Sequence, residues 1–529
     1  MLFLLAVIVG LLYYFGTSTF GFFDKRGVKS SKPYPYVGNM LSLVLGQKHL
    51  NAIVNEVYCK YKDEKVFGIY NFTGPALVVN DLDLIKRITV KDFDHFTDHG
   101  QVITATDNDP LFAKNLFSMR GEKWHNMRSS LSPAFTGSKM KEMMPFVTEC
   151  SERFIEHVKK EVESTSGKGC MEIEVKDLMS KLTNDIIASC AFGIQTDSFN
   201  DPENEFYKMS KKLTSIKLKD AIKVLSTAMF PRLRKVINLQ MMDDKVTIFY
   251  RFIVMDIIKQ RNKSGFIRRD MIHLLMLAMK GSLHEEDSTE ALNEDIGFAT
   301  VQEALKGNSV RVWTDDEITA QAVIFLFAGY ETTSTVLSFM CYELANTPDA
   351  QTKLREEIDH YIAESGEMIK YDDIRSLVYM DMVLSETLRL WPPGGVTDRV
   401  CVKQYNLPIK INNQTYTLQK DDVVWIPISA IHRDAQYYTN PNKFIPERFS
   451  EENKGSIKQE TFLPFGIGPR SCVGNRFALM ETKIIMFYLL ANFEIVQTPK
   501  TEIPLKIKSH TFNLHGLNGT WVGLKRRQK

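Results

Sequence analysis

The most specific signal in the sequence is the run Phe465-Gly466-Ile467-Gly468-Pro469-Arg470-Ser471-Cys472-Val473-Gly474. An apolar pattern with helical period follows it directly, from about 477 to 485. A cysteine that precedes a helix meets unpaired backbone N–H groups and the positive end of the helix dipole, and both favour the thiolate over the thiol. The glycines of the run let the backbone turn sharply and approach a flat ligand closely. The run therefore predicts a site built around Cys472, with Arg470 available to an anionic group.

The alternative for Cys472 is a structural role in a glycine-rich turn, which is the usual role of a single cysteine.

The chain has 529 residues and 7 Cys without a Cys-x-x-Cys pair, so neither a disulfide scaffold nor a zinc ribbon is indicated. Its 66 basic and 64 acidic residues nearly cancel, which gives no indication of nucleic-acid binding. With 44% hydrophobic residues, the chain can bury a large core.

The run resembles the Phe-Gly-x-Gly-x-Arg-x-Cys-x-Gly signature of the cytochrome P-450 superfamily, and all six specified positions agree. The resemblance implies that Cys472 is the metal ligand, bound as a thiolate to the iron of haem b. It also implies that Phe465, Arg470 and Gly474 lie against the haem. Such a thiolate would donate electron density to the iron and favour cleavage of the O–O bond.

Two further stretches resemble parts of the family that bind the haem propionates. Trp124-His125-Asn126-Met127-Arg128 is similar to a Trp-x-x-x-Arg motif, whose two named side chains lie on one face of a helix. Taken alone, such a pair is more often a packing or cation–π pair. Arg399 stands where the family often has a second propionate-binding arginine.

A third stretch, Ala328-Gly329-Tyr330-Glu331-Thr332-Thr333, resembles the family's motif on the distal side of the haem. Without the family, hydroxyl residues inside a helix mostly bond back to the carbonyl four residues earlier. The resemblance implies that the Thr332 hydroxyl holds water above the haem and that the Glu331 carboxyl passes protons to it. Ala328 would lie against the haem, and Gly329 would leave room for dioxygen.

Glu386 and Arg389 resemble the family's Glu-x-x-Arg pair, and 446–449 resembles its Pro-Glu-Arg-Phe stretch. A Glu and an Arg three residues apart often form only a solvated surface pair. Here apolar neighbours predict burial, and a buried ion pair needs a third group to satisfy it. The resemblance implies that Arg448 is that group, in a structural triad behind the cysteine loop.

Residues 2–23 are predominantly apolar and long enough to cross a bilayer core, and no basic residue precedes them. Four basic residues between 25 and 32 follow, which predicts an N-terminal transmembrane signal anchor that leaves the rest of the chain in the cytoplasm. A cleaved signal peptide is the alternative, but the basic leading region and a clear cleavage site are missing. Residues 24–39 are expected to form a basic, proline-rich linker, stiff and extended from 32 to 39.

The rest of the chain, 40–529, is expected to form one catalytic domain that is mainly α with a minor β part. Strand-like runs occur at 66–70 and 76–79, separated by a Gly74-Pro75 turn, and return near 407–427 and in the last 30 residues. The polar stretch 281–312 is expected to be an exposed loop.

The strongest predicted helix spans about 315 to 346. Thr314 and Glu317 form a capping box at its start, and Pro348 follows its end. Its centre is almost wholly apolar, but five polar side chains at 331–335 argue against a second membrane span. We therefore expect a long central helix that is buried on all sides.

The resemblance implies an oxidoreductase, a monooxygenase of the endoplasmic reticulum membrane that inserts one oxygen atom from O2 into lipophilic small molecules. Xenobiotics such as plant toxins or insecticides, and endogenous hormones or lipids, are the candidate substrates, and the pattern is most similar to the insect detoxification branch. Electrons would come from NADPH through a separate reductase, with a cytochrome b-type donor as the alternative source. The other readings are a haem-thiolate isomerase or dehydratase, whose known members usually lack the Glu331–Thr332 pair, and a non-catalytic haem-binding protein.

Three surfaces are expected to contact the substrate, the membrane and the reductase. Apolar residues near Ala328, with Phe112, Phe117 and the turn at 394–397, are expected to line a lipophilic pocket. Residues 206–236, rich in lysine between apolar residues, predict either a contact with the membrane surface or an ordinary amphipathic helix pair. The basic side chains expected to face an acidic reductase are Lys458, Arg476 and Lys483.

Overall fold

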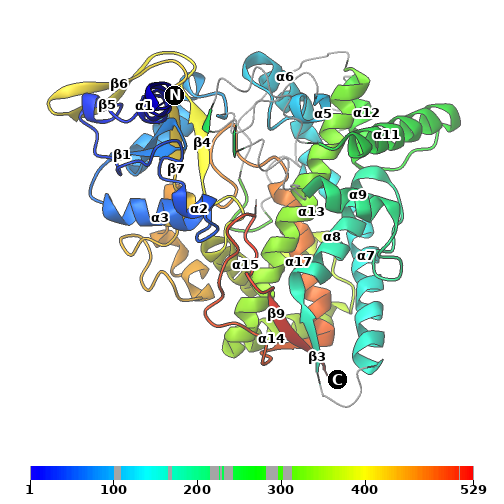
Figure 1. The fold of residues 1–529 in the computed structure, drawn as a ribbon. Coiled ribbons are helices and arrows are strands. Elements are labelled where there is room, and N and C mark those ends of the chain that lie inside the picture. The colour runs from blue at the N-terminus through cyan, green and yellow to red at the C-terminus, as the bar shows by residue number, and fades with distance from the viewer. Residues whose placement is uncertain are drawn as a thin grey trace.

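The computed structural model describes residues 2–100, 109–164, 170–214, 225–226, 229–230, 242–280, 296–301, 313–511 and 513–527. Within these ranges the chain is mainly helical with a minor β part, as predicted (Figure 1). The helices are α1 (Leu2–Thr17), α2 (Leu41–Val44), α3 (Leu50–Lys60), α4 (Leu82–Lys86), α5 (Pro110–Ala113), α6 (Gly121–Leu131), α7 (Gly137–Ser164), α8 (Val175–Ile187), α9 (Glu205–Thr214), α11 (Asp244–Ser264), α12 (Met271–Lys280), α13 (Asp315–Asn346), α14 (Pro348–Ser365), α15 (Val378–Leu390), α16 (Ile428–Ile431) and α17 (Asn475–Asn492). The strands are β1 (Val66–Asn71), β2 (Gly74–Val79), β3 (Met171–Glu174), β4 (Thr397–Val400), β5 (Tyr405–Ile411), β6 (Gln414–Leu418), β7 (Val423–Ile426), β8 (Phe493–Val496) and β9 (Trp521–Arg526).

In the described part of the chain the strands form two sheets and a hairpin. The larger sheet has the order β1-β2-β7-β4, in which β2 and β7 are parallel and the other neighbours antiparallel. The smaller sheet has the order β3-β9-β8, and β5 pairs with β6. The predicted strands at 66–70 and 76–79 are confirmed. The turn lies at Phe72 and Thr73, two residues before the predicted Gly74-Pro75, because Gly74 already pairs with Asn71 in the ladder.

The long central helix is confirmed as α13. Thr314 Oγ1 accepts from the Glu317 backbone N–H at 3.2 Å, and the Glu317 carboxylate accepts from the Thr314 N–H at 2.9 Å, so both halves of the capping box form. Among the described residues α13 alone is long and apolar enough to cross a membrane, yet 67% of its apolar window is buried inside the protein. Figure 1 shows α13 running through the middle of the molecule beside α8 and α17. It is therefore a core helix.

Gly329 has a different role from the one expected. A Cβ at this position would lie 2.5 Å from Cδ1 of Ile187 on α8. The space beside the glycine is thus filled by the neighbouring helix, and the expectation that it is left open for dioxygen is wrong. The missing side chain allows α8 to pack closely against the centre of α13.

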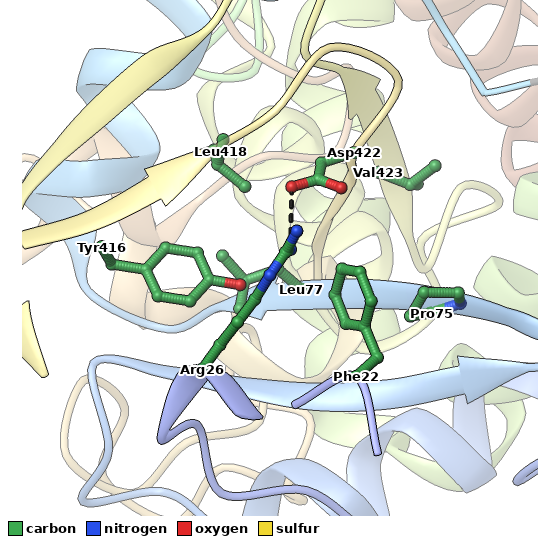
Figure 2. A pocket seen from close by; sticks show the side chains of 8 residues that line it. All are labelled: Phe22, Arg26, Pro75, Leu77, Tyr416, Leu418, Asp422 and Val423. Carbon is green, nitrogen blue, oxygen red and sulfur yellow. Dashed lines mark hydrogen bonds and ion pairs between the residues drawn. The ribbon is translucent and has the colours of Figure 1, made fainter. Parts of the chain in front are cut away.

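The apolar N-terminal run divides into two parts. Helix α1 is exposed along most of its length, whereas Phe23 is fully buried beneath β1. Figure 2 shows the junction, where Arg26 crosses the Phe22 ring and pairs with Asp422 at 3.0 Å. Phe22 and Phe23 therefore pack with the core around the larger sheet, although they fall within the predicted anchor.

The linker segment is also packed. Tyr34 and Gly38 exchange two backbone hydrogen bonds of 2.9 and 2.8 Å, so the expected extended spacer is a tight turn. Tyr36 lies at the tip of this turn, and its backbone N–H donates to the carbonyl of Gly16 in α1 at 3.2 Å. Most of the stretches 206–236 and 281–312 lies outside the described residues.

Candidate active site

The cysteine loop is held in one conformation by its backbone. The N–H of Cys472 donates to the carbonyl of Phe465 at 2.8 Å. Gly466 and Gly468 have φ of 73° and 78°, in the left-handed region that favours glycine. A Cβ at Gly468 would lie 1.9 Å from the carbonyl oxygen of Thr89. The backbone conformation of the loop therefore favours glycine at 466 and 468 whether or not a ligand is bound.

The Cys472 side chain is exposed, although many of the residues around it are buried. Helix α17 begins three residues later, with Gly474 at its N-cap. Gly474 has an ordinary φ of −90°, and a Cβ there would meet only Phe135 at 3.8 Å. Since the protein leaves room for a side chain at 474, a flat ligand against the loop is what would fill that space.

The same region of space is bounded by α13. Phe135 packs edge-on against Phe325 of α13, with ring centres 5.2 Å apart. Along one face the helix carries incompletely covered positions spaced three or four residues apart, which we call the accessible strip: Ile324, Phe325, Ala328 and Thr332. Ala328 is the most exposed of them and lies near the centre of the helix. Phe135 thus lies next to both the cysteine loop and the accessible strip.

The Thr332 hydroxyl lies on the accessible strip. It donates to the carbonyl of Ala328 at 2.6 Å, the back-bond that threonine commonly makes inside a helix. Its oxygen still has accepting capacity for a water or a ligand. Ala328 and Thr332 are therefore brought together on the side that a bound group would face.

Glu331 is buried on another side of α13. Its Oε1 lies 3.0 Å from Nε2 of His515 and 3.3 Å from Nζ of Lys176. Burial works to raise the pKa of the Glu331 carboxyl, but the hydrogen bond from His515 and the charge of Lys176 outweigh it and hold that pKa below its ordinary value. The sequence predicted Glu331 but not its two partners, because α8 and the C-terminal segment carry no local pattern that pairs them with α13.

Three predicted arginines gather near one another. Arg128 of α6, Arg399 of β4 and Arg470 of the cysteine loop are all buried or nearly so. Burial lowers the pKa of Arg399 to about 10. Burial, and next the charge of Arg399, lower the pKa of Arg470 to about 9. Crowded, poorly solvated guanidinium groups of this kind are stabilised by an anion.

The guanidinium of Arg470 is fixed by its surroundings. It lies over the ring of Trp124 at 4.0 Å and donates to the carbonyls of Thr97 and Met119, each at 2.8 Å. Trp124 is itself fully buried on α6. The structure thus brings Trp124 together with Arg470, a contact that the sequence did not suggest.

Three residues that the sequence analysis missed complete this region. Asp98 accepts from the N–H of Gly121 at 2.8 Å and lies 3.7 Å from Arg470. Asp398 accepts from Nδ1 of His99 at 2.9 Å, and its backbone carbonyl accepts from Arg399 at 2.7 Å. Only their adjacency in space marks these residues, since none lies in a recognisable motif.

The thiol of Cys472 and the three arginines together fit haem. The two carboxylates, Asp98 and Asp398, do not balance the three arginines. Nε of Arg399 is buried without a hydrogen-bond partner among the described residues. Two propionates would supply the missing acceptors and negative charge, while Cys472 offers sulfur to the iron.

The Glu386 triad lies behind the cysteine loop. Arg389 reaches the Glu386 carboxylate through two bonds of 2.7 and 2.8 Å, and Arg448 lies 3.3 Å from the same carboxylate. Arg389 also donates to the carbonyl of His432 at 2.7 Å, and His432 accepts from the N–H of Leu463 at 2.8 Å. The triad is therefore connected to the segment that leads into the loop.

One expected surface residue is buried. The Nζ of Lys483 lies 2.9 Å from Asp381 and donates to the carbonyl of Ile296 at 2.7 Å, and the side chain is almost fully covered. The expectation that Lys483 faces a reductase is wrong, because its helix period turns it into the core. Lys458 is exposed and Arg476 is half-buried.

The comparisons with known proteins agree with this site. The Cytochrome P450 family model matches residues 28–521. Cytochrome P450 9e2 of Blattella germanica is 45% identical, with 99% of this chain and 97% of the relative covered. Probable cytochrome P450 9f2 of Drosophila melanogaster is 38% identical, with 99% and 98% covered. Cytochrome P450 6k1 of Blattella germanica is 34% identical, with 98% and 95% covered.

The chain therefore belongs to the cytochrome P450 family, and it is an oxidoreductase of the haem-thiolate monooxygenase class. Within the family it is similar to insect members of the P450 9 and 6 groups. The predicted family, its insect branch, the enzyme class and the haem cofactor are confirmed. When bound, the haem supplies the activation of dioxygen, and the protein supplies ligand, protons and orientation.

Proposed function

We propose that the protein oxygenates lipophilic small molecules, either xenobiotics such as plant toxins and insecticides or endogenous hormones and lipids. The accessible strip of α13 carries this proposal. Ile324, Phe325 and Ala328 are apolar and incompletely covered. Ala328 lies one turn from Thr332, and Ile324 and Phe325 lie about two turns from it. A substrate held there would lose apolar surface to the strip while its reacting atom lies near the only hydroxyl of that strip.

In this proposal each predicted residue has one task. Cys472 ligates the iron, and Phe465, Gly474 and Ala328 lie against the faces of the haem. The residues that bind the propionates are Trp124, Arg128, Arg399 and Arg470. Thr332 holds water, and Glu331 delivers protons towards it.

Electrons are proposed to come from NADPH through a separate reductase, with a cytochrome b-type protein as a second donor. The exposed Lys458 and the half-buried Arg476 near the cysteine loop support a contact with an acidic partner. Arg476 lies in the first turn of α17, directly after the cysteine loop, so a partner docked at Arg476 would be near the thiolate.

The location is proposed to be the endoplasmic reticulum membrane, with the catalytic domain in the cytoplasm. Helix α1 is apolar and exposed, and basic residues follow it. Phe230 packs against Tyr36, with ring centres 4.6 Å apart, next to the end of α1. This part of the 206–236 segment therefore lies on the same side of the domain as the anchor, which supports its contact with lipid.

The experiment is reconstitution of the full chain with NADPH–cytochrome reductase and lipid, followed by a screen of steroids, terpenoids and pesticides for oxygenated products. We expect a thiolate-type Soret band from the reduced carbon monoxide complex, and product only with NADPH. Cys472→Ser should lose that band, while the conservative surface variant Lys458→Arg keeps it. Product without NADPH would indicate an isomerase or dehydratase, and a normal band with no NADPH use on any substrate would indicate a haem-binding protein.

A further inference from the structure

The Glu331 carboxylate is held by two groups from different parts of the chain. Lys176 on α8 lies 3.3 Å from Oε1, and its Nζ also donates to Oγ of Ser334 at 2.5 Å and to the Glu331 carbonyl at 3.2 Å. His515 reaches the same Oε1 at 3.0 Å from the C-terminal segment. One carboxylate oxygen therefore has both a fixed cation and an imidazole as partners.

The two partners differ in their access to solvent. The Lys176 side chain is 9% exposed and that of Glu331 is 10% exposed, whereas 29% of the His515 side chain is accessible. Ile507 and Gly516 bridge the segment that carries His515, and the Lys508 N–H donates to the His515 carbonyl at 2.8 Å. The imidazole is thus positioned by its backbone at the boundary between solvent and the buried pair.

The charge balance distinguishes the two partners further. Lys176 alone neutralises the buried Glu331 carboxylate, so His515 is not needed as a second cation. Within the described ranges, His49, which precedes α3, is a further titratable group close enough to His515 to interact with it, and Glu174 acts on Lys176. Burial lowers the pKa of His49, which favours its neutral form. Because Lys176 keeps the carboxylate paired, the His515 imidazole can give up a proton without leaving Glu331 unpaired.

We propose that His515 carries protons from solvent to the Glu331 carboxylate, from which they pass towards the Thr332 hydroxyl. The inference rests on the proposed oxygenation and assigns its proton supply. In the first transfer the N–H bond of the imidazolium breaks and an O–H bond forms on Glu331. In the second that O–H breaks as the proton moves to water held by Thr332, and His515 regains a proton from bulk water. Each cycle moves one proton and no electrons.

The test compares His515→Gln with wild type in the reconstituted full-length protein. Glutamine keeps an N–H donor for Glu331 but cannot carry a proton. Since a positioned proton donor contributes on the order of 10²-fold and water can partly replace it, we expect about a tenfold fall in product formed per NADPH. The yield of the variant should also respond to pH differently from that of wild type, because the variant has no group at this position that solvent can reprotonate.

His510→Gln is the matched control, because His510 is exposed on the same segment. It should keep wild-type yield and pH dependence. Haem content and the carbon monoxide band should be unchanged in both variants, which separates proton supply from a folding defect.

Infrared spectroscopy of the resting protein provides a second readout that needs no turnover. The Glu331 carboxylate band, identified by its loss in Glu331→Gln, should shift with pH in wild type and stay fixed in His515→Gln. The relay is wrong if His515→Gln keeps wild-type yield, or if the band shifts equally without the imidazole. If wild type itself makes no product from NADPH and oxygen, the proposed oxygenation has failed, whereas the infrared result still tests the coupling of His515 to Glu331.

Discussion

At the scale of single residues, the Thr332 hydroxyl is the group whose loss has the most specific consequence. Its oxygen lies on the accessible strip, one turn from Ala328. Thr332→Ala removes the site where water would be held, so proton delivery becomes disordered. We expect NADPH consumption to continue while most of the reduced oxygen leaves as hydrogen peroxide, measured as peroxide and product per NADPH.

Thr332→Ser is the control for this prediction, since it keeps the hydroxyl. It should retain more product than the alanine variant. Tight coupling of NADPH to product in Thr332→Ala would rule out the role in proton delivery.

Glu481 on α17 is a second residue with a measurable signature. Burial raises the pKa of its carboxyl from 4.5 to about 8, which the nearby Thr333 hydroxyl only partly opposes. The folded protein therefore keeps this proton at pH values where the unfolded chain has lost it. The resulting stability is present at low pH and is lost as the pH rises from about 4.5 to about 8.

Glu481→Gln should remove this part of the pH dependence. At about 1.4 kcal/mol per pKa unit, the wild type should lose several kcal/mol over the window relative to the variant. The measurement is the melting temperature of both proteins from pH 5 to about 8.5, with the surface variant Glu451→Gln as control. A constant difference between wild type and Glu481→Gln across that range would contradict the buried, proton-bearing carboxyl.

At the scale of elements, the close packing of α8 on α13 depends on Gly329. In Gly329→Ala the new Cβ overlaps Cδ1 of Ile187, which lies 2.5 Å away. Overpacking of this kind costs about 1–3 kcal/mol, more than alanine gains in helix propensity. Ile187→Val deletes the overlapping methyl, so the double variant should recover most of the loss.

Guanidinium unfolding of the four proteins in this cycle measures the coupling between the two positions. Gly455→Ala serves as control, since a Cβ there meets nothing within 4 Å. Additive losses in the double variant would show that the two helices do not meet at Gly329.

The Glu386 triad joins α15 to the segment before the cysteine loop. Glu386→Gln would leave the charges of Arg389 and Arg448 without their shared carboxylate in a buried site. Breaking a buried pair in this way costs about 3–5 kcal/mol. Unfolding midpoint and haem bound per chain should both fall.

The matched comparison is the exposed pair between Lys353 and Glu447, which are 2.6 Å apart. Lys353→Met should cost less than about 1 kcal/mol, because solvent screens an exposed pair. Equal losses in the two variants would mean that the triad contributes no more than a surface ion pair.

At the scale of the whole molecule, the structure shows where the exposed helix α1 ends and the packed core begins. Deletion of residues 2–17 removes α1 alone and should leave a folded, haem-binding domain. Deletion of 2–27 also removes Phe23, which fills the space over Gly68, and Arg26, which pairs with Asp422 (Figure 2). Because loss of a buried phenylalanine costs about 3–5 kcal/mol, the protein that lacks residues 2–27 should have a lower melting temperature and bind less haem than the protein that lacks residues 2–17.

Phe23→Ala in the full chain is the control that separates packing from anchoring. It should lose stability as the longer deletion does while still sedimenting with membranes. If both deletions melt alike, residues 18–27 do not belong to the domain.

The sequence by itself determined what depends on neighbouring residues. The bounds of α13 follow from the Thr314–Glu317 capping box and from Pro348, and the turns of the cysteine loop follow from its glycines. Backbone preferences and caps act over a few residues, so they can be recognised without the fold. The haem-thiolate class was predictable for the same reason, since its motif is ten consecutive residues.

Only the tertiary structure decided which side chains meet across long separations. Lys176 and His515 reach Glu331, and Asp98 lies beside Arg470, although no local pattern pairs them. The same holds for residues whose local pattern indicated another environment, such as Phe23 in the domain core rather than the membrane and Lys483 in the interior rather than on the surface. These contacts are set by how whole elements pack, and the free energy that selects them is gained only when distant segments exclude water together.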